Sequence, residues 1–219
     1  MRLYNFDVSP FAARCRLAIY RKGLDVEIAA VPEGGPRGAA YRALNPIGKV
    51  PALELDDGTV IPESEVIVDY LEERFPEPPL LPETPEDRAR VRLLSRLGGL
   101  YLMPPMGRLF GQMRAGGPRD AAVVDAALAE VGSALDHLEH FASGDQGGWI
   151  AGEAFTLADC ALVPLLAVHH RLLPAFGESE PLGGHPKLAG YWPRVLSDPI
   201  VAKVSAEMEA GFRRMMAQG

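Results

Sequence analysis

Ser9 lies at a position where a side chain could take part in binding or catalysis. It follows a short alternating segment, Arg2–Phe6, that predicts a strand, and it precedes Phe11, where a helix is expected to begin. A hydroxyl at this point lies beside a helix N-terminus, whose N–H groups carry positive partial charge. A serine in front of a proline is also typical of a plain helix N-cap. The local pattern therefore leaves two roles open, capping and hydrogen bonding to a bound anion.

A second stretch that could bind a ligand runs from Ile47 to Leu53. Pro51 stands at the entry of a short apolar strand, where a residue without an N–H is tolerated. If the Val50–Pro51 bond is cis, the peptide groups of Val50 point outward and can pair with a ligand. Ten residues later Glu63-Ser64 opens a helix, with Ser64 expected as its N-cap. Free N–H groups at that helix start could bind a carboxylate, so the two features together could hold a small peptide.

The elements around these residues follow the order strand, helix, strand, helix, strand, strand, helix. The first strand, helix and strand form one βαβ unit, so the two strands should be parallel, with a right-handed crossover. Within the first helix Arg14, Arg21 and Lys22 are expected to be solvated. The predicted ranges are Arg2–Phe6, Phe11–Gly23, Asp25–Val31, Ala39–Leu44, Ala52–Leu55, Thr59–Ile61 and a last helix from Ser64 to about Phe75.

After this α/β part a proline-rich linker over residues 78–85 leads into helices only. The predicted division is therefore a domain over residues 1–77 and an all-helical domain over residues 86–219. In the second part Thr156 and Asp159 form a capping box for a very apolar helix, a role in folding rather than in chemistry. Residues 143–148 are predicted to form a loop.

Composition excludes several classes of function. The chain has 219 residues, is 47% hydrophobic and carries a net charge of −7, which argues against nucleic acid as the main partner. No apolar run is long enough for a membrane span, and the first residues are not expected to act as a signal peptide. The two cysteines, Cys15 and Cys160, are expected to be reduced and buried in a cytoplasmic protein. The histidines have no patterned third and fourth partner, so no metal site is expected.

The motif around Ser9, the Ile47–Leu53 stretch, Glu63-Ser64 and Trp149–Asp159 together resemble the cytosolic glutathione transferase family over nearly the whole chain. Ser9-Pro10-Phe11-Ala12-Ala13-Arg14 is similar to the motif of the serine-type members (tau, theta and zeta-like), of a bacterial type. The resemblance implies a thioredoxin-like domain followed by an all-helical one, a symmetric homodimer, and glutathione as co-substrate without a metal.

The resemblance also implies roles for single residues. Ser9 would donate a hydrogen bond to the sulfur of glutathione, Val50 would pair with its cysteinyl backbone, and Pro51 would shape the turn. The γ-glutamyl end would be held by Glu63 and Ser64, and the glycyl carboxylate by Lys49, with Arg37 as a weaker candidate. Arg14 is more plausibly structural. An electrophile pocket would be lined by Phe11, Tyr101, Met103, Met106 and Phe110, although these apolar side chains could equally be core packing.

These roles predict a glutathione transferase, of the kind used in detoxification, that joins glutathione to a small hydrophobic electrophile. A non-catalytic protein of the same fold that binds a ligand or a partner is the main alternative. A glutathione-dependent isomerase of the zeta type is a third, although the chain lacks the Ser-Ser-Cys cluster of that type. Peroxidase activity would need only the thiolate and stays open, whereas Ser rather than Cys at position 9 disfavours thiol–disulfide exchange.

Overall fold

The computed structural model describes residues 1–115, 117–143 and 148–217, so most of the loop predicted over residues 143–148 lies outside the described residues. The chain divides into two compact units. The first comprises Met1–Leu80 together with Asp198–Gly219, and the second comprises Leu81–Ser197. The sequence placed residues 198–219 in the helical domain, whereas by its contacts this segment belongs to the first unit.

The first unit is built on a four-stranded sheet with the order β2-β1-β3-β4. Strands β1 and β2 are parallel, as the βαβ pattern predicts, and the other pairs are antiparallel. Leu3 of β1 lies opposite Ile28 of β2 and Leu53 of β3. The strands are β1 (Arg2–Asn5), β2 (Glu27–Ala30), β3 (Ala52–Glu54) and β4 (Val60–Pro62).

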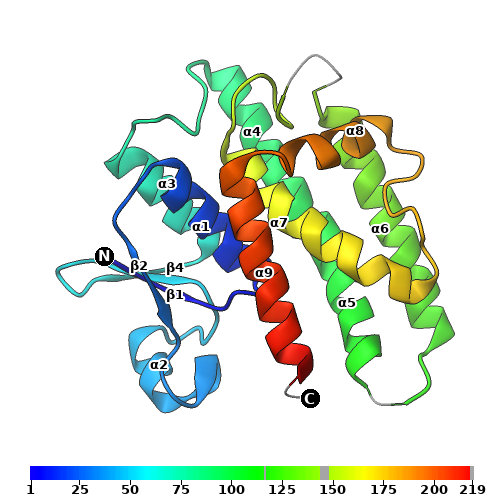
Figure 1. Ribbon diagram of the computed structural model, residues 1–219, viewed down its shortest axis with the longest axis horizontal. Coiled ribbons are helices and arrows are strands. Elements are labelled where there is room, and N and C mark those ends of the chain that lie inside the picture. Colours follow the sequence, from blue (N-terminus) through cyan, green and yellow to red (C-terminus); the bar gives the residue numbers. More distant parts are fainter. Residues whose placement is uncertain (116, 144–147, 218–219) are drawn as a thin grey trace. The chain divides into compact units, whose positions relative to one another are not determined.

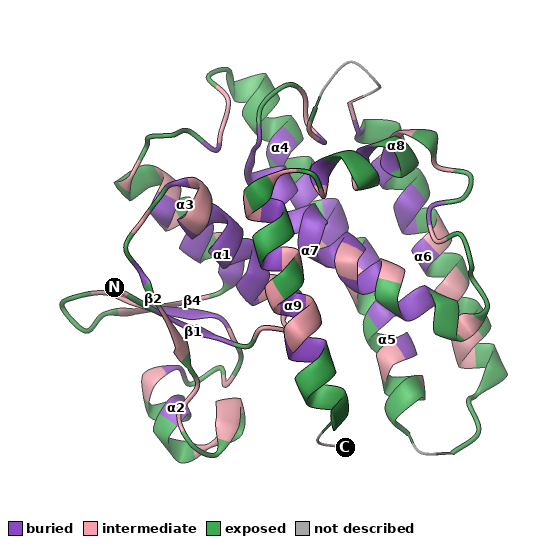
Figure 2. Ribbon diagram, in the orientation of Figure 1, coloured by how far each residue is buried: buried purple, intermediate pink, exposed green. Residues whose placement is uncertain are grey.

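Helices cover both faces of this sheet (Figure 1). Because side chains alternate along a strand, Leu3 and Leu53 point to one face and Tyr4 and Ala52 to the other. The second face packs against Tyr41 of α2, which has no exposed surface. The helices of this unit are α1 (Pro10–Arg21), η1 (Gly35–Arg37), α2 (Ala39–Leu44), α3 (Ser64–Arg74) and the C-terminal α9 (Pro199–Ala217), and Figure 2 shows that α1 is the most deeply buried of them.

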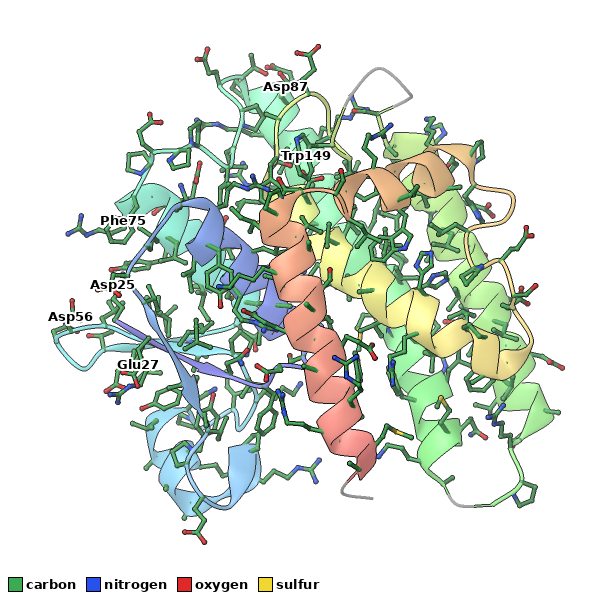
Figure 3. The ribbon with its side chains drawn as sticks, in the orientation of Figure 1. Asp25, Glu27, Asp56, Phe75, Asp87 and Trp149 are labelled. Carbon is green, nitrogen blue, oxygen red and sulfur yellow. The ribbon has the colours of Figure 1, made fainter. Side chains whose placement is uncertain are left out.

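The prediction that Arg14 and Lys22 are solvated was wrong, since both are buried. The ammonium of Lys22 lies 2.7 Å from a Glu72 carboxylate oxygen and donates to the carbonyls of Phe75, at 2.7 Å, and Pro78, at 2.8 Å. Phe75 ends α3, at the place labelled in Figure 3. All three N–H groups of the lysine are thus satisfied, and this is what makes its burial tolerable.

The second unit is helical. Its elements are α4 (Pro85–Leu97), the π-helical turn η2 (Gly98–Leu102), α5 (Met103–Arg114), α6 (Ala121–Phe141), α7 (Leu157–Leu172), η3 (Leu173–Phe176) and α8 (Pro186–Val195). Helix α7 is buried along most of its length and forms the centre of this unit (Figure 2). A Cβ atom at Gly98 would lie 2.6 Å from a methyl carbon of Leu162 and 2.8 Å from one of Leu165, so a side chain here would displace these core side chains of α7.

The predicted capping box at the start of α7 is confirmed. The Thr156 hydroxyl accepts from the Ala158 N–H at 3.3 Å, and the Asp159 carboxylate accepts from the Thr156 N–H at 2.8 Å. The same carboxylate also accepts from the Ile150 N–H at 3.0 Å and the Tyr191 hydroxyl at 2.9 Å. Asp159 is fully buried, so its partners join the cap, the preceding turn and α8 in one network.

Both cysteines are free thiols and both are buried, as expected. Burial raises the pKa of the Cys15 thiol to about 12, so this side chain stays protonated and unreactive at neutral pH. Among the described residues, none of the helices has the length and apolar character needed to cross a bilayer. In the same residues, His, Cys, Asp and Glu do not gather into a group that could hold a metal ion.

Candidate functional site

Ser9 is the N-cap of α1. Its Oγ accepts a hydrogen bond from the Ala12 N–H at 3.3 Å, and its own N–H donates to the Phe6 carbonyl at 3.0 Å. Pro10 follows as the first helical residue, where its lack of an N–H costs nothing. Capping uses the oxygen of Ser9 as an acceptor, and the described part of the chain offers its hydroxyl proton no acceptor. Capping and donation to a bound anion are therefore compatible in one side chain.

The turn before β3 presents the backbone of Val50. The Val50–Pro51 peptide is cis. The preceding carbonyl, that of Lys49, accepts from the Tyr41 hydroxyl at 2.9 Å and from the Asn45 side-chain amide at 2.8 Å. Tyr41 and Asn45 are both buried, so this carbonyl is held from the interior. In the described residues the N–H and C=O of Val50 have no hydrogen-bond partner, as the motif predicts.

The start of α3 differs from the sequence prediction. Ser64 is the first helical residue rather than the N-cap, and Glu63 is the N-cap. Glu63 has a φ of 69°, in the left-handed region, and its side chain makes no capping hydrogen bond. The side chain of the N-cap residue thus leaves this helix start uncapped, and the helix dipole there favours an anion. The anion site stays a prediction, and Ser64 would not make it by capping.

Arg14 ties α1 to this helix start. Its guanidinium donates to the Ser64 Oγ at 3.2 Å, lies 3.3 Å from a Glu65 carboxylate oxygen and sits 5.9 Å from the centre of the Phe11 ring. Only 3% of its side chain is exposed. A buried cation with these partners fixes the position of Ser64 relative to α1, which is a positioning role rather than contact with a ligand.

Most of the predicted glutathione-binding residues lie around one small cavity of about 120 Å³. An adjoining groove of about 420 Å³ shares Lys49 and Val50 with it and adds Arg37. Ser9 does not line the cavity, but Phe11, two residues further along α1, does. The cavity is lined by Phe11, Asn45, Lys49, Val50, Pro51, Glu63 and Ser64.

Sequence reasoning missed Asn45 and Tyr41, which hold the Lys49 carbonyl. The signal for Asn45 was present, because an Asn in front of Pro46 is typical of an Asx turn, and its Oδ1 does accept from the Ile47 N–H at 3.1 Å. No local signal marks Tyr41, since its hydroxyl reaches the turn only through tertiary packing.

The other residues predicted for the electrophile pocket lie on η2 and α5 of the second unit. Met106 is fully buried, whereas Tyr101 is 53% exposed and packs edge-on against His137. Met103 and Phe110 are half-buried. Met106 thus belongs to the core of its unit, and the pocket role of the other three remains a prediction.

Comparisons with known proteins identify the family of the chain. The glutathione S-transferase N-terminal domain family matches residues 3–79, and the corresponding C-terminal domain family matches residues 98–199. The chain belongs to the glutathione S-transferase family. The resemblance seen in the motifs, and the thioredoxin-like fold followed by helices, are thereby confirmed.

The names of relatives within the family describe more than one activity. A maleylacetoacetate isomerase of Pseudomonas aeruginosa is 38% identical over 176 residues, covering 78% of this chain and 82% of that protein. Glutathione S-transferase 3 of Zea mays is 30% identical and covers 94% and 93%. The crystal structure of a maleylacetoacetate isomerase from Methylobacterium extorquens AM1, with bound malonate and glutathione, has a TM-score of 0.75, 30% identity, and coverage of 94% and 96%.

Proposed function

We propose that this protein binds glutathione at the cavity of the first unit and activates its sulfur through Ser9. The observation that carries the proposal is that Ser9 caps α1 with its oxygen, while its hydroxyl proton has no acceptor among the described residues. Members of the family use glutathione, and a 30% identical relative has been crystallised with it.

The tripeptide would lie along the turn and the start of α3. The unpaired N–H and C=O of Val50 can make two backbone hydrogen bonds to the cysteinyl residue, as in an added strand. The start of α3, which the N-cap side chain leaves uncapped, together with Ser64, suits the carboxylate of the γ-glutamyl residue. Glu63, exposed at the rim, suits its ammonium group. Lys49 and Arg37, in the adjoining groove, suit the glycyl carboxylate.

Ser9 would then act on the sulfur. A free thiol with a pKa of about 8.5 is roughly 3% ionised at pH 7. Lowering the pKa by about two units requires roughly 2.7 kcal/mol of preferential stabilisation of the thiolate. A hydrogen bond to a charged group supplies about 1.5–3 kcal/mol, and the nearby helix N-terminus adds to it. The stabilisation from one hydroxyl at the start of α1 is therefore large enough to lower the thiol pKa by about two units.

The reaction favoured by the site is transfer of glutathione to an apolar electrophile. The thiolate attacks an electrophilic carbon, a sulfur–carbon bond forms, and the electron pair leaves with the displaced group or moves into an activated double bond. Next to Ser9 the chain offers Pro10 and the aromatic Phe11, which lines the cavity, rather than a second hydroxyl or a thiol. This apolar neighbour suits a hydrophobic substrate.

Glutathione-dependent cis–trans isomerisation is the second candidate. The maleylacetoacetate isomerase relatives favour it, and one of them was crystallised with both malonate, a dicarboxylate, and glutathione bound. In this reaction the thiolate would add to one carbon of a cis double bond, the resulting single bond would rotate, and elimination would release the trans isomer and the thiolate. Glutathione would act as a catalyst and would not be consumed.

The test combines binding, ionisation and turnover. Calorimetry with glutathione and the thiolate absorbance of the complex against pH are measured for the wild type and Ser9→Ala. We expect the wild type to bind with a lowered thiol pKa, and Ser9→Ala to return that pKa towards the free value. Absence of glutathione binding would refute the proposal and favour a non-catalytic binding protein. Incubation with 1-chloro-2,4-dinitrobenzene or with a maleyl substrate then separates the two reactions, because only transfer consumes glutathione.

A further inference from the structure

The C-terminal helix contacts the loop that carries Ser9. Gly211 of α9, which is buried, lies against this loop. A Cβ atom at this position would lie 2.7 Å from the Cβ of Asp7, 3.1 Å from a side-chain carbon of Val8 and 3.2 Å from the Val8 nitrogen. Asp7 and Val8 directly precede Ser9. The helix backbone therefore lies against the loop so closely that only glycine fits.

Charged groups lie on both sides of Gly211: one pairs with the loop directly, and the other pairs with an α1 side chain that also binds the loop. Arg214, one turn further along α9, makes an ion pair with the Asp7 carboxylate. Glu207, one turn earlier, accepts from the Arg16 guanidinium at 2.6 Å. Residues 207, 211 and 214 are spaced by four and three and so lie on one face of the helix.

Arg16, in α1, connects this face of α9 to the loop. Its side chain is 1% exposed, and besides Glu207 it donates to the Asp7 backbone carbonyl at 2.9 Å. The Asp7 carboxylate also accepts from the Asn5 side-chain amide at 2.8 Å. The main chain and the side chain of Asp7 are thus both held, two residues before the hydroxyl that would meet the sulfur. Helix α9 runs alongside α1 in Figure 1.

We propose that Gly211 and Arg214 of the C-terminal helix are positioning residues for Ser9. The inference rests on the function proposed above for Ser9. A hydrogen bond weakens steeply when its angle is lost, so a small shift of the Asp7–Ser9 loop changes the pKa of the bound thiol. The groups expected to hold the rest of glutathione, on Val50, Glu63 and Ser64, lie on other elements. A disturbance of α9 should therefore change ionisation of the sulfur more than affinity for the peptide.

The test is Gly211→Ala, with Gly132→Ala in α6 and Gly190→Ala in α8 as matched controls. At both control positions a Cβ atom would meet nothing within 4 Å. All three variants make the same change in a helix, and only Gly211→Ala places a Cβ atom against the loop. We expect Gly211→Ala to raise the pKa of the bound thiol by about one unit, from about 6.5 to about 7.5, and to lower kcat at pH 7 about threefold, because the thiolate fraction falls by that factor. The KM for glutathione should stay within about twofold, because its contacts remain.

Arg214→Gln is the second variant, because it lies on an exposed part of α9 and removes only the pair with Asp7. It should shift the thiol pKa in the same direction by less, and it keeps the inference testable if Gly211→Ala fails to fold. Urea unfolding measures the effect of each variant on stability. If Gly211→Ala and Arg214→Gln lower stability but leave the thiol pKa unchanged, α9 only supports the fold and the inference is wrong.

Hydrogen exchange of the peptide containing Val8 and Ser9 separates this inference from the proposed function. The exchange is measured without glutathione and should increase in Gly211→Ala but not in the two controls. Unchanged exchange would refute the support of the loop by α9, whatever the protein does with glutathione. A wild type that shows no lowered thiol pKa would overturn both proposals, since Ser9 would then have no sulfur to act on.

Discussion

Tyr41→Phe tests whether the interior of the first unit sets the affinity for glutathione. The Tyr41 hydroxyl donates to the Lys49 carbonyl at 2.9 Å, and the Asn45 amide donates to the same oxygen at 2.8 Å. Removing one of two donors leaves the carbonyl satisfied, so the loss should be that of one ordinary hydrogen bond, about 1 kcal/mol. If this energy holds Val50 in its binding geometry, glutathione affinity falls by up to about fivefold, since 1.4 kcal/mol corresponds to tenfold.

The double variant Tyr41→Phe/Asn45→Ala should lose more binding free energy for glutathione than the sum of the losses in the two single variants. It leaves the part-buried Lys49 carbonyl without either of these donors, and an unsatisfied acceptor shielded from water costs about 1–3 kcal/mol. A double-mutant cycle on glutathione affinity, measured by calorimetry, gives this coupling directly. The thiol pKa of the complex should not change in any of these variants, because Ser9 lies on a different element.

Tyr4→Phe is the matched control. Tyr4 packs edge-on against Tyr41 with ring centres 5.7 Å apart, but its hydroxyl donates to Glu54 rather than to the turn. It should leave glutathione affinity unchanged. Equal weakening by Tyr4→Phe and Tyr41→Phe would show that general packing of the cluster, not the hydrogen bond to Lys49, controls binding. A raised thiol pKa in Tyr41→Phe would contradict the separation of binding from activation.

Three further changes test the buried charges and histidines. Arg14→Met should lower the free energy of unfolding by about 2 kcal/mol and weaken glutathione binding, because Ser64 loses a charged donor; intact affinity in calorimetry would contradict its positioning role. Lys22→Met should lower the free energy of unfolding in urea by about 3 kcal/mol or more, because Glu72 and two carbonyls lose their cation. A decrease below about 1 kcal/mol would mean that the buried ion pair adds little stability. Burial lowers the pKa of His169 to about 3, so only the unfolded chain gains its proton as pH falls below about 6.5. Stability should therefore decrease towards pH 4, by up to about 3 kcal/mol from this group, and His169→Leu should flatten that slope; an unchanged slope would contradict the burial of a neutral ring.

Local patterns in the sequence were sufficient for much of the fold and part of the site. Alternation and helical spacing place β1, α1 and β2 to within a few residues, because hydrophobic periodicity follows directly from backbone geometry. The capping box of Thr156 and Asp159 is likewise local, since both partners lie within one helical turn. Ser9 at the start of α1 and the Val50–Pro51 turn were found because short-range chemistry fixes them.

Tertiary structure alone decided how these parts are held. Arg14 and Lys22 look like surface residues in the sequence, because a charge on a helix is usually solvated, yet each has partners about fifty residues away that make burial possible. Tyr41 reaches the Lys49 carbonyl only because α2 folds back over the sheet. Arg16 meets Glu207 across 191 positions, and Gly211 meets the Ser9 loop across a similar distance. No periodicity encodes such contacts: the sequence determined which residues could do the chemistry, whereas packing between distant segments decided which residues support them.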